Sequence, residues 1–340
     1  MRISVEAYRA LIRGERRGPL AMLGRAGLRL ASVPYRLGVA WRNRQYDRGR
    51  GIHRAAVPVV SVGNLSLGGT GKTPAVEYVA RFYRDQGVRP VILSRGYGSD
   101  TGANDEALVL EENLPDVPHL QGADRALLAD AAVEELEAEL LILDDGFQHR
   151  RLHRDLDIVL IDATCPPHRD RLFPRGTLRE PAGNLKRASA ALLTRCDQVG
   201  PSELKATRDW LKMRFPNLPV AESEHRPRGE LNDWNGKEVA AFCGIGNPEA
   251  FRKTLENLGA EVIAFRTFPD HHAYTRGDVD DLRSWAGQPS EGAVIATTQK
   301  DWVKLRLTEL AGRPLRTIRI AMEFRDGEAE FQDLLRTLLQ

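Results

Sequence analysis

The sequence predicts an α/β protein with a doubly wound parallel sheet, a second and smaller α/β domain, and an N-terminal basic amphipathic helical segment. Three observations support this fold class. After residue 50, short apolar runs alternate with segments of helical length. A second, shorter series of the same kind follows a stretch rich in proline, glycine and charge, and arginines are concentrated in the first 50 residues.

The composition fits a soluble globular chain of two domains, with 340 residues, 42% hydrophobic and 28% charged. A net charge of +2 gives no reason to expect a nucleic-acid partner, and nothing in the sequence requires an obligate protein partner. The three cysteines, Cys165, Cys196 and Cys243, lie far apart, which favours free thiols in a reducing compartment over a zinc site or a disulfide framework. No apolar run approaches the ~20 residues of a membrane span.

Residues 1–50 form the first predicted part, with 12 arginines against three acidic residues. Apolar positions recur there at spacings of three and four: Leu20, Leu23, Gly27, Leu30, Pro34, Leu37 and Trp41. This spacing predicts an apolar stripe on a helix that Pro34 should break or restart. A stripe backed by arginine suits a helix lying in an anionic lipid interface, although amphipathic helices more often pack on a protein core. The sequence leaves both interpretations open.

Residues 51–228 are predicted to form the core of the molecule. Its apolar runs are nearly continuous rather than alternating, which is typical of parallel strands buried on both faces. The predicted strands are Pro58–Val62, Pro90–Leu93, Leu140–Leu143, Asp157–Ile161 and Ala188–Leu193. The predicted helices between them are Pro74–Gln86, Arg125–Glu137 and Ser202–Arg214. This succession of strands and helices predicts the doubly wound sheet.

Residues 229–340 are predicted to form the smaller domain, after a linker at Glu222–Gly236. Its predicted strands are Val239–Cys243, Glu261–Phe265, Ala293–Thr297 and Leu315–Ile320. Asn247 followed by Pro248 predicts a helix start, with asparagine as the cap and proline in the first turn.

A glycine-rich loop connects the first predicted strand to the first predicted helix. Its residues are Ser66, Leu67, Gly68, Gly69, Thr70, Gly71, Lys72 and Thr73. In this context backbone N–H groups cradle nucleotide phosphates, Lys72 neutralises their charge and the Thr73 hydroxyl ligates Mg²⁺. Ser66 stands where the usual pattern has its first glycine, and the pair Gly68-Gly69 can still supply the turn. The loop therefore predicts a P-loop NTPase-like core that binds a nucleotide and Mg²⁺.

Acidic and basic clusters follow several of the predicted strands. Asp144 and Asp145 end one strand, and two adjacent carboxylates are best ionised together around a cation, which predicts a metal site. Asp105 and Glu106 lie in a polar stretch that alone indicates only a solvated loop. Two adjacent histidines at 271–272 cannot both face one metal from an extended chain, so a paired metal site is not expected. One of them is suited to partner a general base or to orient a carboxylate, and a plain loop histidine is the alternative.

A basic stretch between residues 169 and 187 suits an anionic group or a solvated face.

Taken together, these segments resemble the tetraacyldisaccharide 4'-kinase (lipid A 4'-kinase) family. The matching residues are Ser61–Asn64, Gly68–Thr73, Ser94–Gly98, Asp105-Glu106, Asp144–His149, Leu178–Pro181, Gly244–Pro248 and Phe268–His271. The resemblance implies transfer of the ATP γ-phosphate to the 4'-hydroxyl of a tetraacyldisaccharide 1-phosphate in lipid A biosynthesis. It also implies a peripheral (monotopic) location at the cytoplasmic face of the inner membrane, where the partners are the lipid substrate and an anionic membrane surface.

The resemblance also implies roles for individual residues. Asp105 would be the base, paired with His271, while Lys72 and Thr73 act on the phosphates and Asp144 and Asp145 serve the metal. Further candidates for substrate contact are Arg95, Glu106, His149, Arg179 and Glu180. The sequence departs from the family pattern at Asn104, Ala107 and Gln299.

Closure between the two domains would assemble the pair of Asp105 and His271 around bound substrate. Two alternatives remain open at this point. A regulatory P-loop GTPase is suggested by the segment 194–197, which approximates a guanine-recognition motif without its lysine. A partition-type membrane ATPase would use the basic helices to toggle on a membrane without any lipid acceptor.

Overall fold

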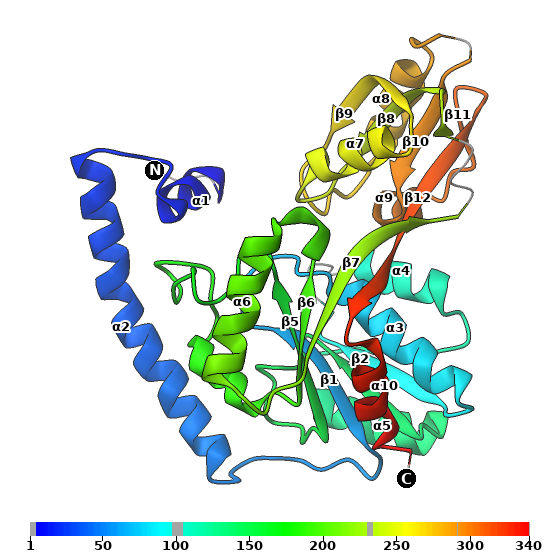
Figure 1. Ribbon diagram of the computed structural model, residues 1–340. Helices are drawn as coiled ribbons and strands as arrows, with labels where there is room; N and C mark the ends of the chain where they lie inside the picture. The colour runs from blue at the N-terminus through cyan, green and yellow to red at the C-terminus, as the bar shows by residue number, and fades with distance from the viewer. Residues whose placement is uncertain (1–4, 97–104, 230–233, 291, 340) are drawn as a thin grey trace. The chain divides into compact units, whose positions relative to one another are not determined.

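The computed structural model describes residues 5–96, 105–229, 234–290 and 292–339 (Figure 1). The chain forms two compact units. Unit 1 comprises residues 1–95, 124–224 and 324–340, and unit 2 comprises residues 96–123 and 225–323. This division differs from the contiguous one expected from the sequence, because residues 105–123 pack with the second unit and the C-terminal residues with the first.

The α-helices are α1 Val5–Arg13, α2 Pro19–Asp47, α3 Lys72–Asp85, α4 Asp105–Asn113, α5 Arg125–Leu136, α6 Pro201–Arg214, α7 Pro248–Asn257, α8 Arg276–Ala286, α9 Gln299–Leu305 and α10 Glu328–Arg336. Two short 3₁₀ helices are η1 Ala182–Arg187 and η2 Cys196–Gln198. The strands are β1 Val59–Asn64, β2 Pro90–Ser94, β3 His119–Gln121, β4 Leu140–Asp144, β5 Leu156–Asp162, β6 Ala190–Thr194, β7 Val220–Arg228, β8 Glu238–Cys243, β9 Glu261–Thr267, β10 Val294–Thr298, β11 Glu309–Leu310 and β12 Arg313–Asp326.

Unit 1 contains a parallel sheet in the order β2-β4-β1-β5-β6-β7. Every residue of β1, β2, β4, β5 and β6 is buried, which is why their sequences are apolar without alternation. The chain leaves the carboxyl end of β1 toward β2 on one side, whereas it leaves that of the neighbouring β5 toward β6 on the other side, so the direction of the connections reverses between β1 and β5. Ligands of open α/β sheets bind at such a point.

Unit 2 contains a smaller parallel sheet in the order β12-β10-β8-β9, with β11 antiparallel to β12. Alternate residues of β8 enter two different cores. Val239, Ala241 and Cys243 contribute to one core, while Ala240 and Phe242 contribute to the other. The predicted second α/β domain is thus a two-sided sheet with its own core. The sequence-based linker at Glu222–Gly236 is wrong in its first part, because β7 continues through Arg228.

Helix α2 differs from the sequence-based expectation at Pro34, which neither breaks nor restarts it. A proline removes one backbone donor and leaves the carbonyl four residues earlier without its helical partner. That carbonyl belongs to Leu30, whose side chain is 74% exposed, so water reaches this turn of the helix. A mid-helix proline is tolerated more easily on such an exposed helix than inside a packed one.

The apolar stripe of α2 faces away from the rest of unit 1. Its exposed members are Leu20, Met22, Leu23, Leu30, Val33, Leu37 and Trp41. The opposite side holds the contacts to the rest of the unit, where the Tyr35 hydroxyl donates to the Arg179 carbonyl at 2.9 Å and Val39 and Asn43 are buried. The stripe is therefore not core-facing. In the part of the chain that the structure describes, no helix is both long and apolar enough to cross a membrane.

Candidate active site

The glycine-rich loop lies at the carboxyl end of β1 and leads directly into α3, as the sequence predicts. Gly71 precedes the helix with φ 84°, a left-handed conformation that favours glycine. Among the described residues, no side chain caps α3 and no acidic residue occupies its first turn. The N–H groups of that turn and the positive end of the helix dipole are thus available to an anion.

Asp144 and Asp145 take different positions at the end of β4. Asp144 is the last strand residue, paired in register with Val62 of β1, and is 7% exposed. Asp145 has φ 54° and accepts hydrogen bonds from Nη1 of Arg179 at 2.7 and 2.9 Å, with Nζ of Lys72 3.6 Å away. The Arg179 Nη1 also donates to Gln148 Oε1 at 3.2 Å. The structure therefore brings Lys72, Asp145 and Arg179 together beside the loop.

The charges around Asp145 determine its ionisation. Burial alone would raise the pKa of Asp145, but the positive charges of Lys72, Arg179 and Arg125 outweigh it and lower that pKa below the ordinary range. Asp145 is consequently a carboxylate at neutral pH, and it holds Lys72 and Arg179 at the mouth of the loop.

The residues present fit a magnesium ion bound together with nucleotide phosphates. Within the described residues, no group of three histidine, cysteine or carboxylate side chains could hold a metal without other ligands. Mg²⁺ in kinases usually takes one or two carboxylates and completes its shell with phosphate oxygens and water. Thr73, at the start of α3, and Asp144, on the neighbouring strand β4, supply a hydroxyl and a carboxylate of the required kind.

Arg125 is not among the site residues predicted from the sequence. Its side chain is buried, and its charge helps to lower the pKa of Asp145. The signal was present, because Arg125 opens α5 directly after the capping Asp124, and a cation in a first turn opposes the helix dipole. The charge of Arg125 also acts on His149. Burial, aided by Arg125, Arg154 and Arg151, lowers the pKa of His149 to about 4, so its ring is neutral at physiological pH.

Glu180 serves as a structural support rather than an open ligand group. Its side chain has 0% exposure, and it accepts from Asn43 at 2.9 Å, from Asn184 at 2.5 Å and from Arg187 at 3.0 and 3.1 Å. Arg42 contacts the other carboxylate oxygen at 3.4 Å. These contacts join the C-terminal half of α2 to η1, which argues against the substrate contact suggested for Glu180.

Unit 2 holds the second group of candidate residues, centred on Asp105 and His271. Nδ1 of His271 lies 2.9 Å from both carboxylate oxygens of Asp105. Asp105 is the first residue of α4 and is buried, so the solvated loop that its local sequence indicated is wrong. Both residues belong to the same unit, so their pairing needs no closure between domains.

The backbone conformation of His271 and its contact with the loop after β8 hold the side chain in this position. His271 has φ 59°, a left-handed conformation that is uncommon for a residue with a side chain and is tolerated where neighbouring contacts fix it. The backbone N–H of His271 donates to the Gly244 carbonyl at 3.2 Å. A Cβ at Gly246 would lie 2.8 Å from Oδ2 of Asp270, so the glycines after β8 let the two loops pack closely. His272 turns elsewhere, with Nε2 3.2 Å from Asp278.

Lysines of α9 approach the same carboxylate. Nζ of Lys304 lies 3.9 Å from Asp105 and 3.3 Å from the buried Asp301. Asp301 in turn accepts from the Gly244 N–H at 3.0 Å and from the Tyr274 hydroxyl at 3.0 Å. Lys304 is not among the residues predicted from the sequence, although it stands one helical turn after Lys300 on α9 and therefore on the same face.

The charges on the pair follow from these neighbours. Burial alone would raise the pKa of Asp105, but the hydrogen bond from His271 and the charges of Lys300, His271 and Lys304 lower it below its ordinary value. The hydrogen bond to Asp105 raises the pKa of His271 above its ordinary value. The arrangement therefore favours an ionised Asp105 and the protonated form of His271.

The remaining candidates are Arg95 and Glu106. Arg95 directly follows β2, and Glu106 lies beside Asp105 on α4 with Oε1 3.2 Å from Nζ of Lys300. Gln299, one of the departures from the family pattern, contacts α4, where its side-chain N–H donates to the side-chain oxygen of Asn113 at 2.7 Å. The departure at Asn104 lies outside the described residues, whereas Ala107 is buried in α4.

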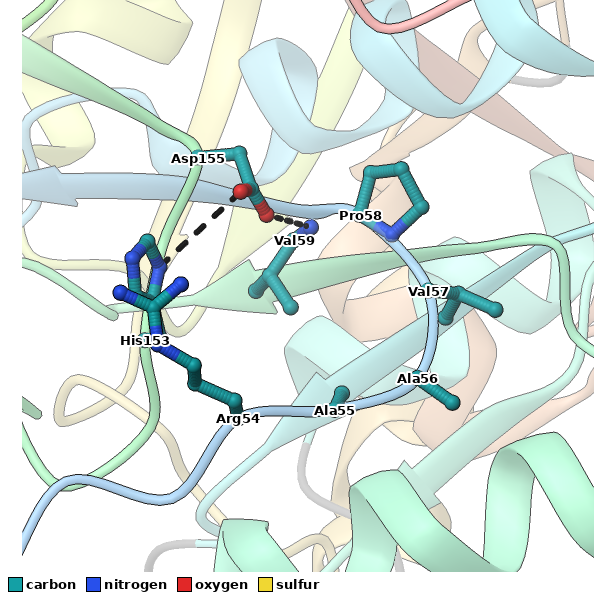
Figure 2. Close-up of a pocket in the computed structure, with 8 residues that line it drawn as sticks. All are labelled: Arg54, Ala55, Ala56, Val57, Pro58, Val59, His153 and Asp155. Atoms are coloured by element: carbon teal, nitrogen blue, oxygen red, sulfur yellow. Dashed lines mark hydrogen bonds and ion pairs between the residues drawn. The ribbon is translucent and has the colours of Figure 1, made fainter.

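A cavity of about 270 Å³ lies at the opposite end of β1 from the loop (Figure 2). Its lining includes residues 54–59, His153 and Asp155. Asp155 accepts from the backbone N–H of Val59 at 2.8 Å, so its carboxylate secures the start of the strand. Ligands of parallel sheets bind at the carboxyl ends of strands, which makes this cavity a poor candidate for the active site.

The loop, its lysine and the strand-end carboxylates define a phosphotransferase of the P-loop class. The family model described as tetraacyldisaccharide-1-P 4'-kinase matches residues 25–340. The chain therefore belongs to the tetraacyldisaccharide-1-P 4'-kinase family and is a kinase.

Individual relatives agree with this assignment. The tetraacyldisaccharide 4'-kinase of Anaeromyxobacter dehalogenans (strain 2CP-C) is 43% identical, with 92% of this chain and 90% of the relative covered. That of Syntrophus aciditrophicus is 37% identical, with 95% and 94% covered. The crystal structure of LpxK from Aquifex aeolicus in complex with ATP is 34% identical, with a TM-score of 0.74 over 93% of this chain and 99% of that one. The alternative GTPase and partition-type ATPase interpretations are not favoured.

Proposed function

We propose that this chain transfers the γ-phosphate of ATP to the 4'-hydroxyl of a tetraacyldisaccharide 1-phosphate, with Asp105 and His271 acting on the hydroxyl. The observation that carries the assignment of these two residues is the buried Asp105 carboxylate held by His271 at 2.9 Å, in a chain that also has a phosphate loop. A hydroxyl nucleophile needs an acceptor for its proton and a fixed orientation toward phosphorus.

Asp105 orients the sugar hydroxyl and accepts its proton late in the transfer. A carboxylate with a lowered pKa is a weak base, so it does not remove the proton before the phosphoryl group arrives. The transition state for phosphoryl transfer is loose, and the hydroxyl becomes acidic only as its bond to phosphorus forms. His271 holds the carboxylate so that one oxygen faces the hydroxyl.

The loop side of the reaction neutralises charge. The N–H groups at the start of α3 would bind the phosphates, and Lys72 and Arg179 would bring positive charge to the β- and γ-oxygens. Mg²⁺, when bound through Thr73 and Asp144, would supply further positive charge to the same oxygens. Asp145 keeps Lys72 and Arg179 in place before nucleotide binds, since it contacts both cations.

The exposed stripe of α2 supports a peripheral location on an anionic membrane, at the cytoplasmic face of the inner membrane. Seven large apolar side chains in one 29-residue helix are more than 50% exposed, and α2 also carries arginines. An exposed apolar patch of this kind marks an interaction surface, and a lipid interface satisfies both the apolar and the cationic side chains. A substrate with four acyl chains would itself lie in such an interface.

A labelling assay tests the proposed reaction. Purified protein is incubated with Mg²⁺, γ-labelled ATP and the disaccharide 1-phosphate in detergent, and the product is treated with mild acid. The glycosidic 1-phosphate is lost under these conditions, while a 4'-phosphate ester is retained. The proposal predicts label in the acid-stable lipid fraction for the wild type and its absence for Lys72→Ala. Label released only as inorganic phosphate would contradict it.

A vesicle assay tests the location. The wild type should sediment with vesicles containing anionic lipid, and a variant with Leu23→Glu and Leu37→Glu should remain in the supernatant. Both changes place a charge on exposed positions, so the thermal midpoint should stay within about 2 °C of the wild type. Equal sedimentation of the two proteins would exclude the stripe as the membrane contact.

A further inference from the structure

Two residues that the proposed reaction leaves without a role, Thr194 and Arg195, contact the backbone of the phosphate loop. Thr194 ends β6 with 0% exposure, and its Oγ1 donates to the carbonyl of Thr70 at 2.9 Å. Nη2 of Arg195 donates to the carbonyl of Gly69 at 2.7 Å. Consecutive residues of one strand end therefore hold consecutive carbonyls of the loop.

Arg195 is itself fixed by a second contact. Its Nη1 pairs with Oδ2 of Asp162 at 2.5 Å, and Oδ1 of Asp162 accepts from the N–H and the hydroxyl of Thr164 at 2.9 and 2.7 Å. Asp162 ends β5, the neighbour of β6, with Asp162 and Thr194 in register. Arg195 has φ 57°, a left-handed conformation that costs free energy in a residue with a side chain. Such strain persists where contacts of this kind enforce it.

The direction of the loop peptides follows from these contacts. A trans peptide is planar, with its C=O and N–H pointing to opposite sides. Holding the carbonyl of Gly69 toward Arg195 therefore directs the N–H of Thr70 away from Arg195. Holding the carbonyl of Thr70 toward Thr194 directs the N–H of Gly71 away in the same manner. Asn64 adds a third restraint by donating to Oγ1 of Thr70 at 2.9 Å.

We propose that Thr194 and Arg195 are positioning residues that fix the Gly69–Thr70–Gly71 peptides with their N–H groups preset for the phosphates of the nucleotide. The inference rests on the proposed use of this loop for ATP. The charge of Arg195 is paired with Asp162, so its contribution is the direction of the peptide rather than neutralisation of phosphate. The contacts of Thr194 and Arg195 with the loop give the first two residues of the segment 194–197 a role that requires no recognition of a base.

Binding measurements without any lipid acceptor test the inference. The dissociation constants of Mg·ATP and of Mg·tripolyphosphate are measured by titration calorimetry for the wild type, Arg195→Ala, Arg195→Lys and Thr194→Val. Tripolyphosphate carries the phosphate chain without a base or a ribose, so it reports only on the loop. Arg169→Ala is the matched control, because Arg169 forms an exposed ion pair with Glu203 at 2.9 Å elsewhere in unit 1.

Arg195→Ala should weaken both ligands by a similar factor of about tenfold, since a preset loop loses less entropy on binding. Arg195→Lys should recover only part of the loss, because an ammonium group does not span the Gly69 carbonyl and Asp162 in the manner of a guanidinium fork. Thr194→Val should weaken both ligands in the same direction, and Arg169→Ala should bind as the wild type does. In steady-state kinetics the KM for ATP should rise while the KM for the acceptor is unchanged.

Wild-type binding by Arg195→Ala would overturn the inference. Weaker binding of ATP with unchanged binding of tripolyphosphate would also overturn it, because that pattern indicates recognition of the base. A fall in the thermal midpoint with unchanged dissociation constants, measured where every variant is folded, would reduce both residues to a structural role. These results are independent of the transfer assay, so a failure of the proposed function can be distinguished from a failure of this inference.

Discussion

Replacing His271 with asparagine should move the acidic limb of the kcat/KM profile to higher pH. The change removes the contact of Nδ1 with both oxygens of Asp105 at 2.9 Å. Burial is the largest influence on this carboxylate and acts to raise its pKa, while His271, Lys300 and Lys304 oppose it. Without His271 only the lysines oppose burial, so the pKa of Asp105 must rise. Asp105 is then protonated, and unable to accept a proton, at a pH where the wild type is still active.

The size of the effect follows from the hydrogen bond that is lost. A hydrogen bond to a charged group contributes about 1.5–3 kcal/mol. The side chain of Asp105 is 5% exposed but that of His271 is 57% exposed, so solvent screening places the contribution near the lower end. Since about 1.4 kcal/mol corresponds to one pKa unit, the acidic limb of the profile should move up by about one pH unit.

The alkaline side of the profile provides an internal check. The pKa of His271 is raised, so the protonated ring and its charge-assisted bond are fully present at and below the ordinary value near 6.5. They are lost as the pH rises through the raised pKa. The difference between the wild type and His271→Asn should therefore narrow at high pH, where the wild type has also lost the charge.

Initial rates of lipid phosphorylation, measured across pH for both proteins, provide the test. His272→Asn is the control, because His272 is adjacent in the chain but contacts Asp278 instead of Asp105. An acidic limb that stays in place in His271→Asn would refute the reasoning, as would an equal displacement in His272→Asn. Asp105→Asn should reduce turnover by about 10²–10⁴, and adding His271→Asn to it should cost little more, because the two residues act as a unit.

Three further predictions concern the loop and the fold of unit 1. Lys72→Ala should lower kcat by about a hundredfold or more, since it removes a cation from the transferring phosphoryl group, and a wild-type rate in a labelled-ATP assay would contradict this. Glu180→Gln should lower the free energy of unfolding by about 3 kcal/mol, because it breaks a buried charge network. Urea titration measures this, and an unchanged midpoint would argue against the structural role assigned to Glu180. Gly63→Ala should destabilise the chain by about 1–3 kcal/mol, because its Cβ would lie 2.6 Å from the Phe147 nitrogen. Gly183→Ala is the control and should leave the stability unchanged, because the space around Gly183 is open.

The buried sheet of unit 1 could be predicted because its local pattern and its tertiary environment agree. Strands such as Leu140–Asp144 are buried on both faces, so their sequences are continuous apolar runs that no exposed segment would need. The start of α3 could also be predicted, since a strand, a glycine loop and Lys72-Thr73 occur in the order that a phosphate site requires. These elements depend on residues close together in the chain.

The division into units could not be predicted, because it depends on contacts between distant segments. Residues 96–123 belong with unit 2, where Asn113 of α4 pairs with Gln299 of α9. The sequence alone does not indicate that these two side chains contact each other. The burial of Asp105 follows from the same packing, and its local sequence resembles any polar loop.

The role of Glu180 was hidden for a similar reason. A glutamate among arginines suggests a solvated or ligand-binding surface, and only the structure brings Asn43 and Arg42 of α2 onto it. For α2, the spacing of apolar residues correctly predicted a stripe along one side of the helix. Spacing cannot say whether a stripe faces a core or an open surface.

The measurement that tests the central claim most directly uses an acceptor whose 4'-hydroxyl is replaced by hydrogen. With the normal acceptor, consumption of ATP should match the phosphate incorporated into lipid. With the 4'-deoxy acceptor, both should fall to the background of the protein without acceptor, because the hydroxyl that Asp105 is proposed to orient is missing. Labelled lipid from the 4'-deoxy acceptor at the normal rate would mean that the terminal phosphate of ATP goes to another position, and would contradict the account.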